Sequence, residues 1–198
     1  DFCLSRGLGD VYKRQIFLMA IATLPLVFMA LLLEFASIID LTRHLEIIAL
    51  TNLVFALLLF VSDRKISRRK LSDFSTKDAL IVGIWQSFAV FPGTSRSGAS
   101  ITGARFLNFN RKDAIIISFI LSIPSITLSG AYIALKFFNN SSKIELDHIF
   151  YGIIFSFIIS FLALKFFIKL GETISFTPFV IYRAFLGLGI LVVLNIYP

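Results

Sequence analysis

The fold is decided by a stretch that reads Ala79-Leu80-Ile81-Val82-Gly83-Ile84-Trp85-Gln86-Ser87-Phe88-Ala89-Val90-Phe91, then Pro92-Gly93-Thr94-Ser95-Arg96-Ser97-Gly98, then an apolar run over residues 99–109. Each apolar part is about half as long as the 20 residues that a helix needs to cross a bilayer. Basic residues flank the stretch on both sides, which places both ends on the cytoplasmic side by the positive-inside rule. We therefore predict a re-entrant helix-loop-helix over residues 79–109, with the polar loop at its tip.

The composition places this hairpin in a lipid environment. Hydrophobic residues make up 57% of the 198 residues and charged residues only 16%, and the mean hydropathy is +0.88. That is more apolar surface than one water-soluble core of this size can hide. The composition excludes a soluble globular protein.

Five further apolar stretches accompany the hairpin. They cover residues 16–35, 45–62, 114–138, 149–170 and 178–197. We expect an all-α integral membrane protein with about four transmembrane helices plus the re-entrant unit, and we expect Pro124 to interrupt one span. The charge asymmetry predicts that residues 63–77 lie in the cytoplasm and that residues 139–147 and Pro198 lie outside.

Residues 1–15 differ in composition from everything that follows. They resemble translated sequencing-adapter text, so we expect a non-native segment and assign it no function. A natural polar tail is the alternative. The membrane domain is expected to span residues 16–198.

Charge and cysteine usage narrow the function classes. The formal net charge is +7, but the basic residues gather in short segments between apolar stretches, which excludes nucleic acid as a partner. The single cysteine, Cys3, excludes a disulfide framework and a cysteine-based metal site.

The loop at residues 92–98 carries the chemistry. Two glycines, three hydroxyl side chains and one guanidinium stand directly before a short helix. The unpartnered N–H groups and the positive dipole end of a helix favour a phosphate, and Arg96 can add a bidentate fork. The loop lacks the Gly-Lys-Ser/Thr of a nucleotide P-loop, so ATP is not implied. A polar turn at the membrane surface is the alternative.

Several stretches carry a resemblance to a known family. Residues 83–100, which contain the loop, resemble the second signature of the bacterial undecaprenyl-diphosphate phosphatases, the family linked to bacitracin resistance. Further stretches are similar to family segments in the same order: Ser118-Phe119-Ile120-Leu121-Ser122-Ile123-Pro124 and Ile174-Ser175-Phe176-Thr177-Pro178-Phe179-Val180-Ile181-Tyr182-Arg183. Residues 21–25 resemble the family's mid-chain span. The resemblance covers residues 16–198 and implies that they form part of an inverted-repeat architecture.

The resemblance implies an activity, a substrate and a site. The activity is hydrolysis of undecaprenyl diphosphate to undecaprenyl phosphate and inorganic phosphate, which recycles the lipid carrier for cell-wall synthesis at the bacterial inner membrane. Arg96 matches the arginine that grips the diphosphate and, with Ser95, is implied to be catalytic. The implied substrate-binding residues are Gly93, Thr94, Ser97, Gly98, Ser100 and Gln86. Membrane lipid is the other expected partner, and a homodimer is left open.

One family motif is absent from the sequence. The first signature, a Glu-x-x-x-Glu pair followed by Pro-x-Ser-Ser-Thr-Gly-His, occurs nowhere in the 198 residues. The resemblance implies Mg²⁺ or Ca²⁺ as cofactor, and we expect its ligands in that missing part and none in this chain. We therefore expect an N-terminally truncated fragment that is inactive alone. His44 and His148 are expected to be interfacial residues.

Other interpretations stay open from sequence. A lipid-phosphate flippase or transporter would use the same broken helices and the same anion site. Arg183 fits the family's Tyr-Arg pair and fits a snorkelling arginine equally well. Glu34 is read mainly as an interfacial residue, with a place at the site as the alternative.

Overall fold

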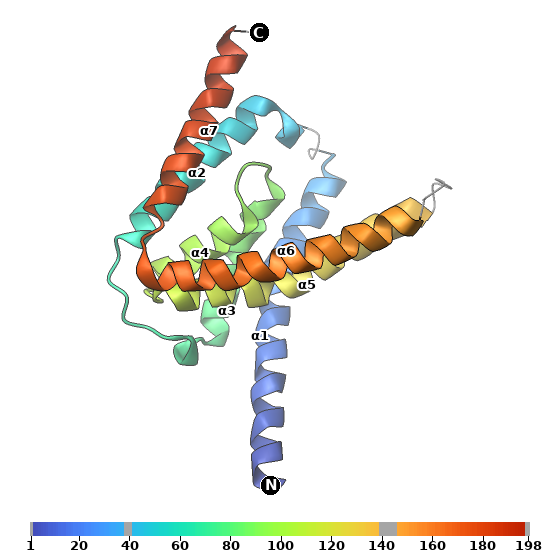
Figure 1. Ribbon diagram of the computed structural model, residues 1–198, viewed down its shortest axis with the longest axis vertical. Helices are drawn as coiled ribbons and strands as arrows, with labels where there is room; N and C mark the ends of the chain where they lie inside the picture. The colour runs from blue at the N-terminus through green and yellow to red at the C-terminus, as the bar shows by residue number, and fades with distance from the viewer. Residues whose placement is uncertain (1, 38–40, 139–145, 197–198) are drawn as a thin grey trace.

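The computed structural model describes residues 2–37, 41–138 and 146–196, and these residues are almost wholly helical (Figure 1). The α-helices are α1 (Phe2–Phe35), α2 (Leu45–Asp63), α3 (Thr76–Ser87), α4 (Arg96–Phe106), α5 (Arg111–Phe138), α6 (Leu146–Thr173) and α7 (Thr177–Ile196). Three short 3-10 helices join them: η1 (Leu41–Arg43), η2 (Leu71–Asp73) and η3 (Phe88–Val90). The expected all-α class is confirmed.

Five helices are long and apolar enough to cross a membrane. Their candidate spans are Lys13–Phe35, Leu45–Asp63, Arg111–Leu135, Ile149–Thr173 and Thr177–Ile196. The number exceeds the expected count of about four, because every apolar stretch outside the hairpin forms a helix of its own. The chain is therefore a multi-pass membrane protein.

The expected interruption at Pro124 is wrong. Helix α5 continues through the proline without a break. The hydroxyl of Ser122 donates to the carbonyl of Phe119, and that of Ser125 lies 3.2 Å from the carbonyl oxygen of Leu121. These hydroxyl bonds go to the carbonyls on either side of Ile120, the residue whose carbonyl loses its helical donor at Pro124.

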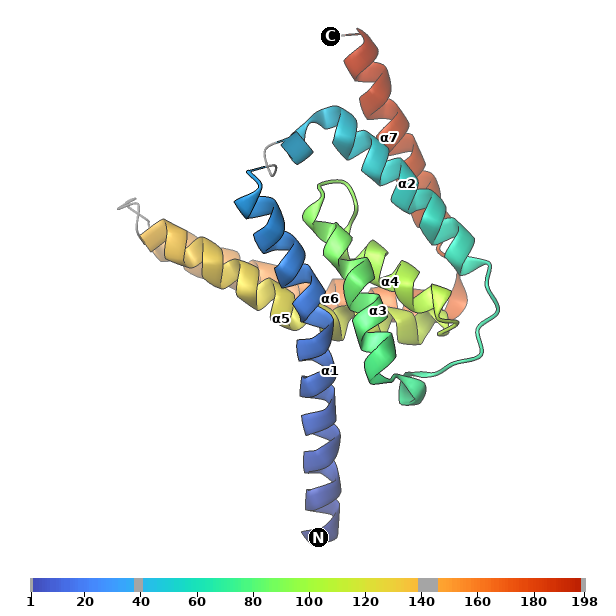
Figure 2. The same cartoon turned by 180° about the vertical axis from the view of Figure 1, so that it is seen from behind.

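Helices α3 and α4 form the predicted re-entrant hairpin, which lies between α1 and α2 (Figure 2). A capping box starts α3: Ser75 Oγ accepts from Asp78 N, and Asp78 Oδ2 accepts from Ser75 N at 2.8 Å. The two ends of the hairpin meet at its base, where the backbone N–H groups of Arg68 and Arg69 donate to the carbonyl of Asn108. The loop between η3 and α4 is the tip of the hairpin.

The buried core is centred on this hairpin. Small residues let its helices approach closely; the side chain of Trp85 on α3 packs directly over Gly103 on α4. Helix α1 packs on α3, α5 packs on α4, and α2 packs on both α4 and α7. Helices α1 to α5 all contribute apolar residues to this core, among them Leu18, Ala22, Leu59, Ala79, Val82, Ile101, Ala104, Ile115, Ile117 and Leu121. The hairpin is thus held rigidly from several sides.

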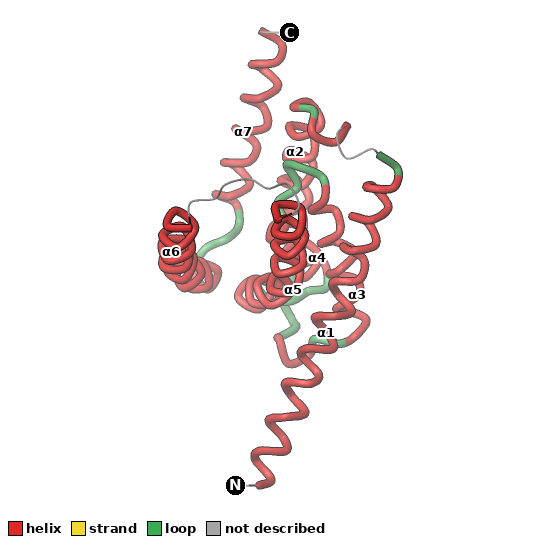
Figure 3. The backbone as a smooth tube through the Cα atoms, turned by 90° about the vertical axis from the view of Figure 1, so that its right-hand side faces the viewer, coloured by secondary structure: helices red, strands yellow, loops and turns green. Residues whose placement is uncertain are grey.

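The outer elements are exposed along most of their length. Helix α6 runs beside α5 (Figure 3) and buries none of its apolar window. Residues 2–15 continue into the first span as one helix, and Arg14 donates to the carbonyl oxygen of Phe74 at 3.0 Å. Most of the predicted outer loop, residues 139–145, and Pro198 lie outside the described residues.

Candidate anion site at the tip of the re-entrant hairpin

The loop at the tip is pressed against α2. Gly93 has a φ of +91°, and a Cβ at this position would collide with the backbone of Ile48. Thr51 Oγ1 donates to the carbonyl oxygen of Pro92 at 2.6 Å. Only glycine meets both the positive φ and the close approach. The glycine therefore fixes the backbone conformation of the loop at this position.

The loop ends at the N-terminus of α4, which Ser95 caps. Ser95 adopts a φ of +65°, a conformation that costs a non-glycine residue strain and is typical of functional sites. Its Oγ accepts from Gly98 N at 3.2 Å, and Ala99 N makes the first helical bond to the carbonyl of Ser95. The N–H groups of Arg96 and Ser97 precede that bond, so they point out of the helix end as donors.

Arg183 is a second arginine of the site. It lies on α7, yet its side chain is buried against the loop with 8% of the residue exposed. Its Nη2 donates to the carbonyl oxygens of Gly93 at 2.8 Å and Thr94 at 2.9 Å, and its Nε donates to Asn52 Oδ1 at 2.8 Å. Asn52 returns a bond from Nδ2 to the carbonyl of Arg183. The snorkelling interpretation is therefore wrong for this residue.

One nitrogen of Arg183 is left for a ligand. Nη1 is buried and has no hydrogen-bond partner among the described residues. It lies beside Gly98, where a Cβ would approach it to 2.9 Å. A buried cationic donor without a partner at a helix N-terminus is a ready position for an anion.

A cavity of about 350 Å³ opens at this point. Its polar lining comes from the first turn of α4 and from the α2–α7 pair, and Phe179 and Tyr182 are among its apolar walls. The polar lining residues are Asn52, Ser95, Ser97, Gly98 and Arg183. The cavity has the size and the polarity of a small-ligand site.

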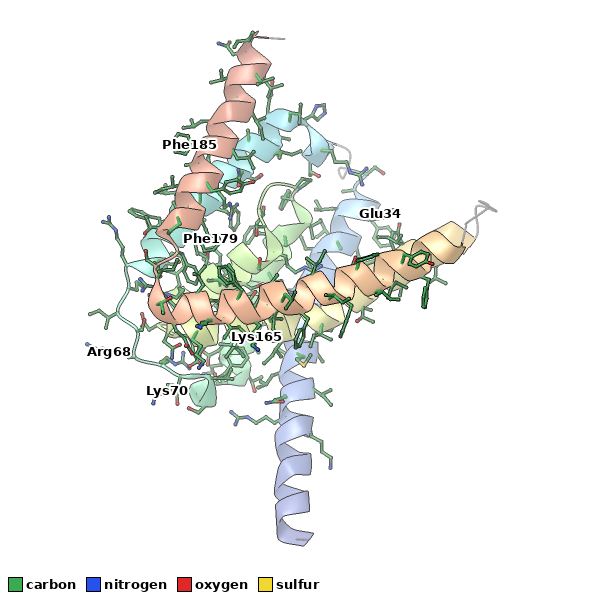
Figure 4. All side chains as sticks on the ribbon, in the orientation of Figure 1. Glu34, Arg68, Lys70, Lys165, Phe179 and Phe185 are labelled. Carbon is green, nitrogen blue, oxygen red and sulfur yellow. The ribbon has the colours of Figure 1, made fainter. Side chains whose placement is uncertain are left out.

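Arg96 faces a different cavity. It lines a mainly apolar groove of about 390 Å³ between α1 and α5, together with Glu34, whose position near the end of α1 is marked in Figure 4. Its Nη1 donates to the carbonyl oxygen of Ser122 at 3.3 Å, and the residue is half-buried. The predicted residues Arg96 and Ser95 thus stand on opposite sides of the same helix end.

Three predicted binding residues lie beneath the loop instead of on its open surface. Thr94, Ser100 and Gln86 are fully buried. Ser100 Oγ lies 3.2 Å from Gln86 Oε1 and 3.1 Å from the carbonyl oxygen of Arg96. Thr94 Oγ1 and Gln86 Nε2 have no partner among the described residues. In this structure these three residues support the loop from within the hairpin.

The described residues do not fit a metal ion. None of their His, Cys, Asp and Glu side chains gather in a set of three or more that could hold one. His44 is exposed at the start of α2, and the side chain of His148 lies outside the described residues. No chemical step at this site can therefore be assigned to a metal held by these residues.

The fold and the loop define a class: multi-pass α-helical membrane proteins in which a re-entrant hairpin presents anion donors at its tip. The chain belongs to the bacitracin resistance protein BacA family, whose model matches residues 5–189. The resemblance seen in the sequence is confirmed.

Curated relatives named undecaprenyl-diphosphatase are similar along most of the chain. The protein of Jannaschia sp. (strain CCS1) is 37% identical over 178 residues, which are 89% of this chain and 67% of the relative. The protein of Ruegeria pomeroyi is 40% identical over 172 residues, 86% of this chain and 64% of the relative. The protein of Dinoroseobacter shibae is 37% identical over 174 residues, which are 87% of this chain and 65% of the relative. The chain spans about two thirds of the length of these relatives.

Proposed function

We propose that this chain binds the diphosphate of undecaprenyl diphosphate at the tip of the hairpin and takes part in its hydrolysis to undecaprenyl phosphate and inorganic phosphate. The observation that carries the proposal is the unpartnered, buried Nη1 of Arg183 at the N-terminus of α4, with Arg96 on the other side of the same helix end. The names of the relatives supply the substrate.

The negative charge of the diphosphate determines the role that each residue of the site would have. Hydrolysis adds water across the phosphoanhydride bond and leaves one phosphate group on the lipid. The N–H groups at the start of α4 and the guanidinium of Arg183 would hold the phosphate oxygens and stabilise the negative charge that grows on them. Arg96, which lines the neighbouring groove, would turn its guanidinium toward the same helix end when the diphosphate binds. Ser95 and Ser97 line the cavity with hydroxyls that can donate to a phosphate oxygen.

We propose that the general acid and base of this hydrolysis come from a segment outside these 198 residues. Neither cavity at the tip is lined by a histidine, and Glu34 is the single carboxylate that lines either of them among the described residues. If the reaction uses Mg²⁺ or Ca²⁺, the ligands would have to come from the same outside segment. The 198 residues alone should therefore bind the lipid diphosphate without hydrolysing it.

A complementation experiment tests this division of roles. Residues 1–198 are expressed alone and together with the segment of a family member that carries the acid pair and the histidine motif, and phosphate release from undecaprenyl diphosphate is measured in detergent. We expect release only from the pair, and loss of that release when Arg96 is replaced by Ala. Release by the 198 residues alone would contradict the proposal. Movement of the intact lipid across vesicles without phosphate release would favour a flippase.

The proposal also places the chain in the bacterial inner membrane, with the base of the hairpin toward the cytoplasm. A variant with Cys3 replaced by Ser would receive single cysteines at Ser67, in the basic linker, or at Ser142, in the predicted outer loop. An impermeant thiol reagent should label Cys at these two positions from opposite faces. Labelling of both from one face would refute this topology.

A further inference from the structure

A second polar cavity, of about 520 Å³, lies at the base of the hairpin, at the far end of α4 from the tip. It opens between the ends of α2 and α4, the start of α5 and the turn before α7. Its lining residues are Phe60, Asp63, Arg64, Lys65, Ser67, Arg105, Arg111, Ser175 and Thr177. The lining therefore holds four cationic side chains and one carboxylate.

The charge of that carboxylate is already neutralised. Asp63 receives Arg111 Nε at 2.7 Å and Arg111 Nη2 at 3.1 Å. The backbone N–H of Phe176 also donates to Asp63 Oδ2, at 3.0 Å, and Arg105 Nε lies 3.5 Å from Oδ1. Asp63 is also 6% exposed in its side chain, so it has little capacity left for further cations.

Arg64 and Lys65 carry positive charges that no carboxylate of the cavity balances. Both are exposed, and neither forms an ion pair with any residue that the structure describes. Arg64 lies over the ring of Phe60 at 4.2 Å, and Lys65 lies over the ring of Phe106 at 5.1 Å. The aromatic rings keep both side chains at the rim of the cavity while the charged groups stay available.

The helix ends at the cavity carry both signs. Helices α5 and α7 begin there with positive dipole ends, at Arg111 and Thr177, while α2 and α4 end there with negative ones, so the positive potential comes from the side chains. The first bond of α7 runs from Val180 N to the carbonyl of Phe176. Asp63 already occupies part of this field as an internal anion, which shows that the position stabilises negative charge.

Hydroxyl groups line the cavity as well. Arg105, which also lines it and is 1% exposed, is already paired, because its Nε lies 3.5 Å from the carboxylate of Asp63. Ser175 Oγ lies 3.0 Å from Thr177 Oγ1, so one of the two hydroxyls remains free to donate. Donors of these kinds, guanidinium and hydroxyl groups beside helix N-termini, suit a phosphate group.

We propose that the cavity at the base of the hairpin binds a phosphate group, carried either by an anionic phospholipid head group or by free inorganic phosphate. The chemistry is the same in both cases: four cationic side chains against one carboxylate, with Arg64 and Lys65 outside any ion pair, and hydroxyl donors around one phosphate group, which is a phosphodiester in the lipid. This site is separate from the tip, and its binding does not depend on the proposed hydrolysis.

Lipid retention tests the proposal. The chain is placed in nanodiscs that contain phosphatidylglycerol within phosphatidylcholine, released, and examined by native mass spectrometry for retained phosphatidylglycerol. The double variant Arg64→Gln/Lys65→Gln removes two charges at the cavity. The matched control Arg68→Gln/Lys70→Gln removes two charges from the same linker, at residues that are labelled in Figure 4 and do not line the cavity. All four side chains belong to exposed residues, so both variants should fold, which a melting curve checks.

We expect the cavity variant to lower the affinity for phosphatidylglycerol at least fivefold and the control to change it less than twofold. An equal loss in both variants would mean general surface attraction and would overturn the proposal. A second arm titrates inorganic phosphate against the retained lipid. Displacement that depends on Arg64 and Lys65 would identify the phosphate group itself as the ligand, and retention of lipid without displacement would identify the head group as its source. Absence of cavity-dependent binding in both arms would refute the site.

Discussion

The two ends of the re-entrant hairpin use arginine in opposite ways. At the base, Arg105 is almost fully saturated: its Nη1 and Nη2 donate to Ser67 Oγ and to three backbone carbonyls, and the carboxylate of Asp63 lies nearby. At the tip, Arg96 and Arg183 have no carboxylate partner among the described residues, and Arg183 keeps one nitrogen unbonded. An arginine at membrane depth is costly unless it is paired or used. The buried Arg105 at the base therefore maintains the fold, whereas the arginines at the tip are prepared for an anion.

The first prediction concerns the structural role of Arg105 at the base of the hairpin. Replacing Arg105 by Ala should lower the free energy of unfolding by about 3–5 kcal/mol, because the carbonyl oxygens that accept from its guanidinium lose their donor, at roughly 1–3 kcal/mol for each buried group left unsatisfied. At about 2–4 °C per kcal/mol, the melting temperature should fall on the order of 10 °C. Arg68→Ala, on the exposed linker, is the control. A loss no larger than the control's would show that the base is not a structural centre.

The second prediction concerns Arg183 at the tip. In the complemented enzyme, Arg183→Ala should reduce kcat/KM for undecaprenyl diphosphate by about 10²-fold, because one charged contact to the developing anion and the support of the loop are lost together. Arg183→Lys should recover only part of it, since an ammonium cannot contact Asn52, the loop carbonyls and a phosphate in one plane. Activity within threefold of the parent would remove Arg183 from the site.

The third prediction concerns the pH dependence of stability, through Asp78 at the base of the hairpin. Burial alone would raise the pKa of Asp78, but hydrogen bonds from Arg69 and Ser75 outweigh it, and the pKa lies below its usual value. A carboxyl whose pKa is lowered by folding stabilises the fold above its unfolded pKa of roughly 3.9, and the contribution disappears as the pH falls through the lower folded value.

Asp78→Asn should accordingly lower the melting temperature at pH 7 by about 2–4 °C, the equivalent of one kcal/mol. The two melting curves should converge below pH 4. A constant gap between parent and variant from pH 7 to pH 3 would show that the Asp78 carboxylate is not what stabilises the base.

The smallest effect is expected from Glu34. It is exposed and shares the groove of Arg96, but no ion pair joins the two residues in the structure. Glu34→Gln should change phosphate release by less than threefold in the complemented enzyme. A loss of about 10²-fold or more would assign this carboxylate to the chemistry and would locate an acid group within these 198 residues.

The hairpin could be predicted from the sequence, but the site could be predicted only in part. Half-length apolar stretches around a polar loop indicate a re-entrant unit from sequence alone, because span length is set by bilayer thickness. The sequence left Arg183 open between the family's Tyr-Arg pair and a snorkelling arginine, since it stands 87 positions after Arg96 and only tertiary packing of α7 on α2 brings it to the loop. Ser95 and Arg96 were expected to act together, yet successive residues at a helix start point in different directions, and they line different cavities.

The charge of Arg96 is the most direct test of the central claim, that the unpaired arginines at the tip bind the diphosphate. Phosphate release by the complemented enzyme is compared for the parent, Arg96→Ala and Arg96→Lys, with Arg68→Ala as the control on the basic linker. We expect a loss of about 10²–10³-fold for Arg96→Ala, a substantial loss for Arg96→Lys, and melting temperatures within a few degrees of the parent. Full activity of a folded Arg96→Ala variant would show that Arg96 does not bind the diphosphate.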